Sequence, residues 1–553
     1  MSNDVDRSPS ANADVCVIGS GVAGALVAYT LASRGHGVVV LEAGRRFGPS
    51  NRLQQMEESL RPSSSSRDVW EMGGERDRFS SSGDVFYGLN NTRVKAVGGT
   101  TLKWLGISPR FHEKDFEMET RYGLASDWPI SYDDLRQYYV MAEREMGVSG
   151  TDDNPFAPPR ETEYPMPAFP PSYSDSLFAD ACEELGITMH SVPQARNSEA
   201  YDGRSECLSF SSCIPVCPSR AKYSADVHVA KATSEGARVI DRAPVQRLEH
   251  DREGRSVEAA VYATPDGIRH RQTADTFVLA AGAVEIPRLL LLSDSPTYPD
   301  GLANSSGLVG EYFMDHPIVS ITARLDEPTN QEPIGYHTSE THQFYDHEEL
   351  RPGSVKMVFN NENPLNPASI AMRGGDAGTR EDLSDVLTGD SWGDQTLEQM
   401  RADSPNRRIS MFGNPEMLPR TANTVTLDRS KTDDHGNPVP DVSYNLGAHE
   451  KATMEYIREI QHDVMAELDA EILHESSLSD PRIASHKMGT TRMGTDPETS
   501  VVDPNLQTHD LENLYITSGS VFVTGGAMNP TLTIAALALK TAHHIHESRK
   551  FAN

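Results

Sequence analysis

The sequence lacks several features that would place the protein in other classes. It has only five cysteines among 553 residues, an odd number that fits a reducing compartment better than a disulfide framework. No run approaches the roughly 18 apolar residues of a membrane-spanning helix. Residues 1–13 lack the apolar core of a signal peptide. We therefore expect a cytoplasmic protein without a membrane span.

Positive charge is also scarce, and lysine in particular. The 50 Lys and Arg residues face 81 Asp and Glu residues, which gives a net charge of −31, and eleven of the basic residues are Lys. A negative protein repels a phosphate backbone, so we expect no nucleic-acid partner. The acidic residues are spread along the chain, which predicts a solvated acidic surface similar to those of proteins from high-salt cytoplasm.

The N-terminal stretch carries a specific motif. Residues 14–44 read DVCVIGSGVAGALVAYTLASRGHGVVVLEAG, in which an apolar strand is followed by Gly19, Gly21 and Gly24, a helical pattern, a second strand and Glu42. Strand, G-x-G-x-x-G turn, helix, strand and acid together form the dinucleotide-binding fingerprint. The glycines would admit a pyrophosphate at the helix N-terminus, and Glu42 would accept a hydrogen bond from a ribose hydroxyl.

A second informative stretch covers residues 481–545. It contains PRIASHKMGTTRMG, NLYITSGSVFVTGGAMNPTLT and IAALALKTAHHI. Asn529 at a cap position and Pro530 at the first helical position predict a helix, which is apolar nearly all round and so buried. Its N-terminus opens onto a glycine-rich loop that includes Gly519, and this end would suit a phosphate or a reduced flavin ring. An ordinary capped C-terminal helix is the alternative interpretation.

Taken together, these motifs resemble the glucose-methanol-choline (GMC) family of FAD oxidoreductases. The resemblance is carried by the two stretches above and by VGGTTLKW at 97–104, FVLAAGAVEIPRLLL at 277–291 and VGEYFMDHP at 309–317. It covers nearly the whole chain. HKMGTTRMG and NPTLT look closest to the branch that contains pyranose oxidases, C-glycoside oxidases and the large subunits of sugar-acid dehydrogenases.

The resemblance implies an α/β fold with two lobes. A Rossmann-like FAD-binding lobe with a doubly wound parallel sheet would comprise residues 1–150, 235–317 and 476–553. A substrate-binding lobe, with an antiparallel sheet backed by helices, would comprise residues 151–234 and 318–475. Strand-like runs between 318 and 475 (IVSITARL, SVKMVF, RRISMF, NTVTLD and VSYNL) favour that sheet. The acidic insertion at 373–406 would be a lid or a solvated loop, and we favour the loop.

The resemblance also implies contacts with FAD. Some pyranose oxidases carry a His that bonds covalently to the flavin, and the corresponding position here is Lys103, so we expect non-covalent FAD. Motif and resemblance together assign cofactor binding to Gly19, Gly21, Gly24, Glu42, Gly98, Gly99, Thr101, Val245, Gly519, Ser520, Pro530 and Thr531.

Two residues are candidates for catalysis. Oxidation of an alcohol needs a base for the hydroxyl proton, and a neutral imidazole suits that role. The 19 histidines do not identify the base by residue type, but His486 matches the catalytic position of the family, and Asn529 matches the second active-site position, where it would hold the substrate oxygen. His316 in MDHP is expected to be structural.

The expected reaction is oxidation of a hydroxyl to a carbonyl, with hydride transfer to the flavin. The resemblance implies a secondary hydroxyl of a sugar or polyol. The electron acceptor is oxygen or an external molecule. A dehydrogenase that uses a quinone, cytochrome or protein acceptor is one alternative, and an FAD-containing lyase on the same fold is another. Oligomeric state stays open.

Two clusters of possible metal ligands are expected to hold no metal. Cys207, Cys213 and Cys217 supply only three thiols at spacings that match no common ligand pattern, so we interpret them as a thiol-rich loop. His543, His544 and His546 fall near the end of the last helix beside charged residues, and we expect them to be solvated.

Overall fold

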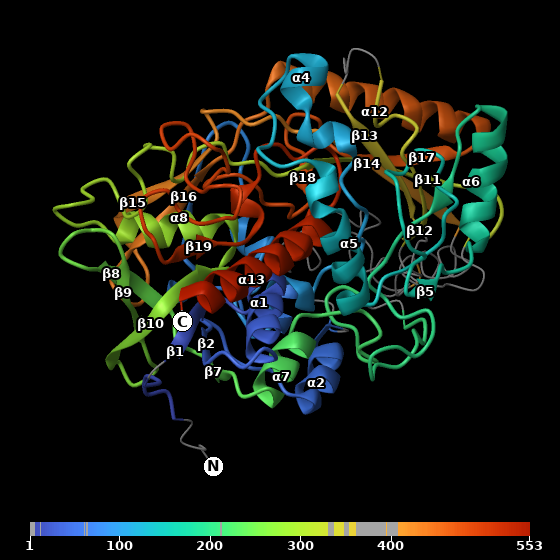
Figure 1. Ribbon diagram of the computed structural model, residues 1–553. Helices are drawn as coiled ribbons and strands as arrows, with labels where there is room; N and C mark the ends of the chain where they lie inside the picture. Colours follow the sequence, from blue (N-terminus) through green and yellow to red (C-terminus); the bar gives the residue numbers. More distant parts are fainter. Residues whose placement is uncertain are drawn as a thin grey trace.

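The computed structural model (Figure 1) describes residues 6–552 apart from residues 12, 60, 62–64, 211–212, 330–336, 348–352, 361–393 and 395–406. Two seven-stranded sheets dominate this part of the chain. The insertion at 373–406 lies outside the described residues except for Asp394, so its interpretation as a loop stays a prediction. None of the described helices is long and apolar enough to cross a membrane.

The first sheet contains the dinucleotide fingerprint. Its strands lie in the order β7-β2-β1-β10-β9-β8, and β19 also pairs with β10. The pairs among β7, β2, β1, β10 and β19 are parallel, whereas β9 pairs antiparallel with β8 and with the first half of β10. The bounds are β1 Ala13–Ile18, β2 Val38–Leu41, β7 Arg238–Ile240, β8 Val245–His250, β9 Val257–Ala263, β10 Arg269–Leu279 and β19 Leu514–Ile516. The expected parallel sheet is confirmed.

The turn between β1 and α1 (Val22–Ala32) depends on glycine. Gly19 has a φ of +99°, in the region that side chains disfavour. A Cβ built on Gly24 would lie 2.0 Å from the carbonyl oxygen of Gly19. Because Gly24 has no side chain, α1 can begin directly against the end of β1.

Four helices pack together near the motif, and two of them, α1 and α7 (Asp226–Ser234), contact the strands of this sheet. Every residue of α1 except Tyr29 is buried, which follows from its almost wholly apolar sequence. α1 contacts α7 and α13 (Thr531–Ala552), and α13 also contacts α5 (Tyr132–Met146). Figure 1 shows α13, in red, lying beside α1. The buried C-terminal helix is confirmed, and it begins one residue after Pro530.

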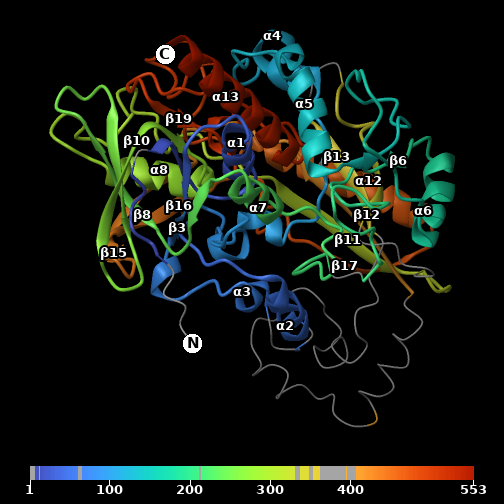
Figure 2. The same cartoon turned by 60° about the horizontal axis from the view of Figure 1, so that its bottom comes forward.

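The second sheet is antiparallel, as the strand-like runs predict. Its order is β17-β11-β14-β13-β12-β6, with β18 also paired to β11. Figure 2 shows α12 (Ala448–Glu467) and α6 (Tyr173–Glu184) beside it, and both helices contact its strands. The bounds are β6 His190–Ser191, β11 Pro317–Arg324, β12 His337–Thr341, β13 Val355–Asn360, β14 Arg408–Pro415, β17 Glu471–Glu475 and β18 Arg482–Ile483.

The two faces of the second sheet differ in polarity. One face carries Val319, Ile321, Met357 and Met411, which are completely buried. A Cβ on Gly413 of the same face would lie 2.7 Å from a side-chain atom of Ile457 in α12, so the helix packs closely there. Residues that alternate with these positions point away from α12, toward the cavity described below.

Two strands expected in the second sheet pair elsewhere. β15 (Thr424–Thr432) and β16 (Pro438–Ser443) join β3 (Ser80–Ser82) in a separate three-stranded sheet that contacts α8 (Gly282–Leu292). Arg288 of α8 donates to Pro438 O (3.1 Å) and to the Asp433 carboxylate (2.6 Å). Alternation of side chains predicts a strand but does not select its partner, which is why the sequence misassigned these two.

The remaining elements are short. β18 comes from a segment assigned to the FAD lobe but pairs with β11, and the division into two lobes stays a prediction. The other bounds are α2 Pro49–Ser59, α3 Ser66–Val69, α4 Met118–Tyr122, β4 Ser149–Gly150 and β5 Met166–Pro167, with 3-10 turns at Glu75–Asp77, Leu89–Asn91, Gly99–Leu102, Glu113–Phe116 and Gly519–Val521.

Candidate active site

A cavity of about 2030 Å³ extends from the glycine turn after β1 to the polar face of the second sheet. Typical sites for drug-sized ligands have volumes of about 300–1,000 Å³. The larger volume here leaves room for a dinucleotide and a second molecule beside it. The lining includes residues 18–23, 41–43, 91–95, 99–101, 103–107, 280–285, 480–487 and 529–531, together with residues of β11, β13 and β14.

The end of the cavity at the glycine turn fits a pyrophosphate. A Cβ on Gly21 would meet nothing within 4 Å, so the N-terminus of α1 opens onto free space. The first N–H groups of a helix carry partial positive charge and bind phosphate. A glycine turn with this opening suits the pyrophosphate of FAD.

Glu42 lies next to this turn. Its carboxylate accepts hydrogen bonds from the Ser20 N–H (3.0 Å), the Ser20 hydroxyl (2.7 Å) and the Gly44 N–H (2.8 Å). Burial raises the pKa of Glu42, and the donors of Gly44 and Ser20 oppose that rise. The carboxylate is thus held at the cavity wall by fixed donors, where it could accept from a ribose hydroxyl.

A second glycine pair packs directly on the first turn. A Cβ on Gly99 would lie 2.9 Å from the Cα of Gly21, and the Gly98 N–H donates to the Ser20 hydroxyl at 3.3 Å. The Thr101 hydroxyl donates to the Gly98 carbonyl at 2.6 Å. The residues of VGGTTLKW therefore form one wall of the cavity, close to the dinucleotide turn.

Most of the predicted FAD-binding residues face the cavity. Gly24, Gly98 and Ser520 are not part of its lining; the Ser520 hydroxyl accepts instead from the hydroxyls of Ser518 and Thr491, at 2.7 Å each. Those that line the cavity are Gly19, Gly21, Glu42, Gly99, Thr101, Val245, Gly519, Pro530 and Thr531.

The two candidate catalytic residues meet on the cavity wall. His486 Nε2 lies 2.9 Å from Asn529 Nδ2, although His486 belongs to a loop after β18 and Asn529 precedes α13. Both residues line the cavity. An imidazole and an amide on one wall can hold a single hydroxyl oxygen, one as proton acceptor and the other as hydrogen-bond donor.

The His486 ring is neutral at physiological pH. Burial lowers its pKa well below the ordinary value of 6.5, and the positive charges of His316 (when protonated), Lys356 and Lys487 add to this effect. A buried histidine with a lowered pKa keeps one unprotonated ring nitrogen at pH 7. The ring can therefore accept a proton.

His316 and Asp315 hold His486 in place. The Nδ1 atoms of His316 and His486 are 3.0 Å apart. Asp315 Oδ1 accepts from the main-chain N–H of His486 at 2.6 Å, and Oδ2 accepts from the Tyr87 hydroxyl at 2.6 Å. Burial lowers the pKa of His316 to about 4 and raises that of Asp315 to about 6. His316 supports the ring of His486, in line with the structural role expected for it.

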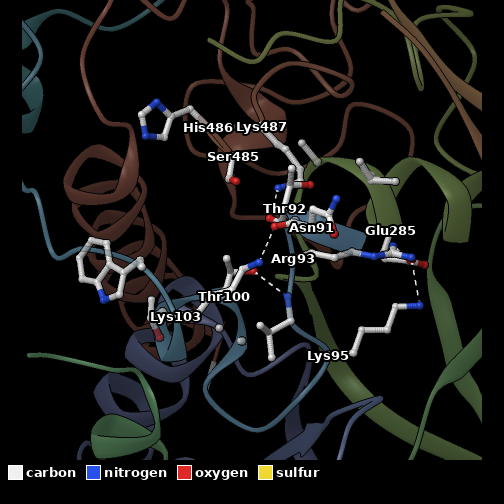
Figure 3. A pocket seen from close by; sticks show the side chains of 18 of the residues that line it. Asn91, Thr92, Arg93, Lys95, Thr100, Lys103, Glu285, Ser485, His486 and Lys487 are labelled. Atoms are coloured by element: carbon white, nitrogen blue, oxygen red, sulfur yellow. Dashed lines mark hydrogen bonds and ion pairs between the residues drawn. The ribbon is translucent and has the colours of Figure 1, made fainter. Parts of the chain in front are cut away.

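Lysines and an ion-pair cluster line the cavity on the side of residues 91–95. Figure 3 shows the Lys487 side chain near Thr92, and Lys487 Nζ donates to the Thr92 carbonyl at 2.5 Å. In the same view Arg93 and Lys95 converge on Glu285, and Lys95 Nζ lies 3.1 Å from the Glu285 carboxylate. Burial lowers the pKa of Lys487 to about 8. These charges give this wall a positive character that suits an anionic group.

Sequence reasoning missed Lys356 of β13 and Glu340 of β12. Lys356 is completely buried, and its ammonium donates to Asn529 Oδ1. Glu340 Oε2 lies 3.4 Å from Lys356 Nζ. The available signal was a lysine at a polar position of SVKMVF in a chain with few lysines. Its contact with Asn529 depends on a sheet and a helix that are distant in sequence, so the pattern did not reveal it.

Polar side chains from three strands face the cavity opposite the glycine turn. Asn360 Nδ2 donates to the Ser410 hydroxyl at 2.8 Å. The other residues of these strands that line this wall are Ile318, Ser320, Thr322, Arg408, Phe412 and Asn414. Hydroxyl and amide groups beside a single aromatic ring suit a molecule that carries several hydroxyls.

The cysteine cluster and the histidine cluster, both expected to hold no metal, lie in different surroundings. No group of three or more His, Cys, Asp or Glu side chains within the described ranges could hold a metal ion, and the five cysteines are free thiols. The expectation of solvated histidines was wrong in part: His543 Nε2 contacts Arg34 at 2.5 Å, and His546 Nδ1 contacts His36 at 2.9 Å. α13 lies against the end of α1 there, so these rings are half-buried.

Comparison with known proteins agrees with this geometry. Family models described as GMC oxidoreductase match residues 17–318 and 419–538. The fructose dehydrogenase large subunit of Gluconobacter japonicus is 32% identical over 97% of this chain and 98% of its own length. The 2-methyl-1,2-propanediol dehydrogenase of Mycolicibacterium austroafricanum is 31% identical over 98% and 96%.

A solved structure shares the fold at low identity. Formate oxidase from Aspergillus oryzae superposes with a TM-score of 0.68 at 16% identity, over 99% of this chain and 100% of the other. The fold and the cavity define a flavoprotein oxidoreductase. The chain belongs to the GMC oxidoreductase family and is an FAD-dependent oxidoreductase.

Proposed function

We propose that the protein oxidises a secondary hydroxyl of a sugar or polyol to a carbonyl, with His486 as the base. The observation that carries this proposal is the contact between His486 Nε2 and Asn529 Nδ2, 2.9 Å apart on the cavity wall. The lowered pKa of His486 keeps the ring unprotonated at neutral pH, as a proton acceptor requires.

The two residues divide the work at the substrate oxygen. His486 Nε2 takes the hydroxyl proton, and the Asn529 amide donates a hydrogen bond to the same oxygen and orients the reacting carbon. FAD, when bound, accepts the hydride that leaves this carbon. The N-terminus of α13 at Pro530 and Thr531 lies on the same wall and favours negative charge.

The polar wall of the second sheet supports a substrate with several hydroxyls. Asn360, Thr322 and Ser410 line the cavity there, and each can donate to or accept from a sugar hydroxyl. Two relatives above 30% identity are named for fructose and for 2-methyl-1,2-propanediol; fructose carries several hydroxyls, and the diol carries one primary and one tertiary hydroxyl. Their names also favour a dehydrogenase, in which an external acceptor rather than oxygen removes the electrons, as the second candidate.

Three further assignments belong to this proposal: the attachment of FAD, the bounds of the two lobes and the location of the protein. FAD is held non-covalently, because Lys103 stands at the position where some relatives carry a bonded His. The FAD lobe comprises residues 1–150, 235–317 and 476–553, and the substrate lobe comprises residues 151–234 and 318–475. A cytoplasmic location rests on the odd number of cysteines.

The test is an anaerobic titration of the FAD-loaded protein with sugars, sugar acids, polyols, simple alcohols and sterols. We expect a sugar or polyol to bleach the visible flavin absorption. Bleaching by a simple alcohol or a sterol alone would contradict the substrate class. Turnover of a substrate without bleaching would favour the lyase alternative. Rapid recovery of the colour in air would identify an oxidase, and slow recovery that a quinone or ferricyanide accelerates would identify a dehydrogenase.

A further inference from the structure

A buried ammonium on the polar face of the second sheet contacts the active-site amide. Lys356 is completely buried in β13 and does not line the cavity, yet its Nζ donates to Asn529 Oδ1. Glu340 of β12 supplies the opposite charge, with Oε2 3.4 Å from Nζ, and Glu340 Oε1 lies 3.0 Å from His342 Nε2. The lysine of this ion pair thus contacts the amide oxygen of Asn529.

The ammonium decides which way the amide of Asn529 faces. The oxygen and nitrogen of an amide have nearly the same shape, so only the partners distinguish them. An ammonium has three donors and no acceptor. Lys356 therefore requires the oxygen of Asn529, which leaves the NH₂ group to face His486 Nε2 at 2.9 Å.

The orientation of the amide in turn decides the tautomer of His486. An amide NH₂ can only donate, so Nε2 of His486 must be the acceptor and carries no proton in the neutral ring. The ring proton is then on Nδ1, where it can donate to Nδ1 of His316 at 3.0 Å. One charged group thus sets the direction of every hydrogen bond from Lys356 through Asn529 and His486 to His316.

We propose that Lys356 is a positioning residue, which orients the Asn529 amide and so keeps Nε2 of His486, the atom that takes the substrate proton, unprotonated. The catalytic consequence rests on the proposed oxidation of a hydroxyl. The orientation of the amide and the tautomer of His486 do not depend on that proposal, and they can be measured separately.

Lys356 also acts on the charge state of His486. Four charged or titratable groups surround this ring. They are Lys356 from β13, the neighbouring residue Lys487, His316, and Asp315, which accepts from the main-chain N–H of His486. Burial, His316 and Lys356 all lower the pKa of His486. Loss of Lys356 therefore raises this pKa, and the acid limb of the pH–rate profile should move to higher pH. A lysine that only supported the fold would leave the limb in place.

The test compares four variants. Lys356→Met alone would leave Glu340 buried without a partner, so the main variant is Lys356→Met/Glu340→Gln, and Glu340→Gln alone is its reference. Lys356→Arg keeps a donor and the charge. The matched control, called Lys114→Met below, also carries Asp115→Asn for the same reason, because Lys114 is buried, donates to Ser354 Oγ at 2.6 Å and lies 3.2 Å from the buried Asp115 carboxylate.

The first readout is the rate constant of anaerobic flavin reduction per bound FAD, from pH 4 to pH 9, with the alcohol that reduces the wild type fastest. For the double variant we expect a fall of about 10²-fold, the size that misplacement of a reacting group produces, and an acid limb at higher pH. Lys356→Arg should recover part of the rate with the limb of the wild type. Lys114→Met should match the wild type in both respects.

The second readout is the ¹⁵N spectrum of the imidazole of His486 in FAD-loaded protein, assigned with His486→Gln. We expect an unprotonated Nε2 in the wild type and in Lys356→Arg, and a mixture of tautomers with a raised pKa in the double variant. If no alcohol reduces the wild type but this pattern is found, the proposed function fails and the role of Lys356 stands.

Two results would overturn the proposal. One is a double variant that keeps the tautomer and pH profile of the wild type. The other is an equal loss of rate in the double variant and in Lys114→Met with no movement of the acid limb, which would mean that buried lysines here serve only the fold.

Discussion

The two sheets line the same cavity but present different kinds of groups to it. The first sheet presents main-chain groups at the turn of Gly19 and Gly21 and at the start of α1, together with one carboxylate, that of Glu42, held by N–H donors. The second sheet presents side chains of residues from 318 to 414, paired across antiparallel strands. Main-chain contacts recognise a shared cofactor, whereas side chains can change between relatives. On the proposed function, the first sheet recognises the cofactor and the second sheet selects the substrate.

The largest effect is expected at the first sheet. In Gly24→Val, the new side chain would begin 2.0 Å from the carbonyl oxygen of Gly19, so α1 must move away from β1. We expect loss of bound FAD and a clear fall in melting temperature, measured by visible absorption and calorimetry. Gly21→Ala is the control, because its side chain would enter open space and only weaken FAD binding. Retention of FAD by Gly24→Val with unchanged affinity would contradict a main-chain cradle.

The next largest effect is expected at His486, the proposed base. His486→Gln should retain FAD but reduce the rate constant of anaerobic flavin reduction by about 10²–10⁴-fold, the range for loss of a general base. Stopped-flow absorbance measures this rate. His462→Gln on α12, about half exposed, is the matched control and should behave like the wild type. A His486→Gln enzyme that reduces flavin at the normal rate would remove His486 from catalysis.

The pH dependence gives a third test. The base must be neutral, and burial lowers the pKa of His486 well below 6.5. The reduction rate should therefore stay constant as the pH falls through 6.5 and decline only in more acidic solution. A limb near pH 6 that disappears in Asp315→Asn would instead report Asp315, whose pKa burial raises to about 6. Half-maximal rate at pH 6.5 or above would contradict a buried neutral base.

The smallest effect is expected on the polar wall of the second sheet. Thr322→Val keeps the side-chain shape but removes one hydroxyl that faces the cavity. Loss of one hydrogen bond is worth about 0.5–1.5 kcal/mol, so KM for the sugar or polyol should rise about 2–12-fold with little change in the visible spectrum. Thr273→Val, on an exposed position of β10, is the control. An unchanged KM would exclude Thr322 from substrate binding.

The sequence predicts the first sheet better than the second for a physical reason. The dinucleotide unit is local, since strand, turn, helix and acid lie within residues 14–44 and their spacing sets their geometry. The positions of His486 and Asn529 came only from the family resemblance, because 19 histidines offer no choice by residue type. The structure brings the two side chains together.

The features that the sequence did not predict depend on long-range pairing. β15 and β16 were recognisable as strands, but β3, which pairs with β16, lies more than 340 residues earlier in the chain. Lys356 sits at a polar position of an alternating strand, which indicates a sheet but not a contact with Asn529. Tertiary contacts of this kind are set by packing of whole elements, which periodicity does not encode.

The measurement that tests the central claim most directly is single-turnover reduction of the FAD-loaded protein under anaerobic conditions, with a substrate that carries deuterium at the reacting carbon. The account predicts that the flavin is bleached, that bleaching is slower with deuterium in the wild type, and that it is slower still in His486→Gln. Consumption of the substrate without bleaching, or bleaching at the same rate with hydrogen and deuterium in both proteins, would contradict it.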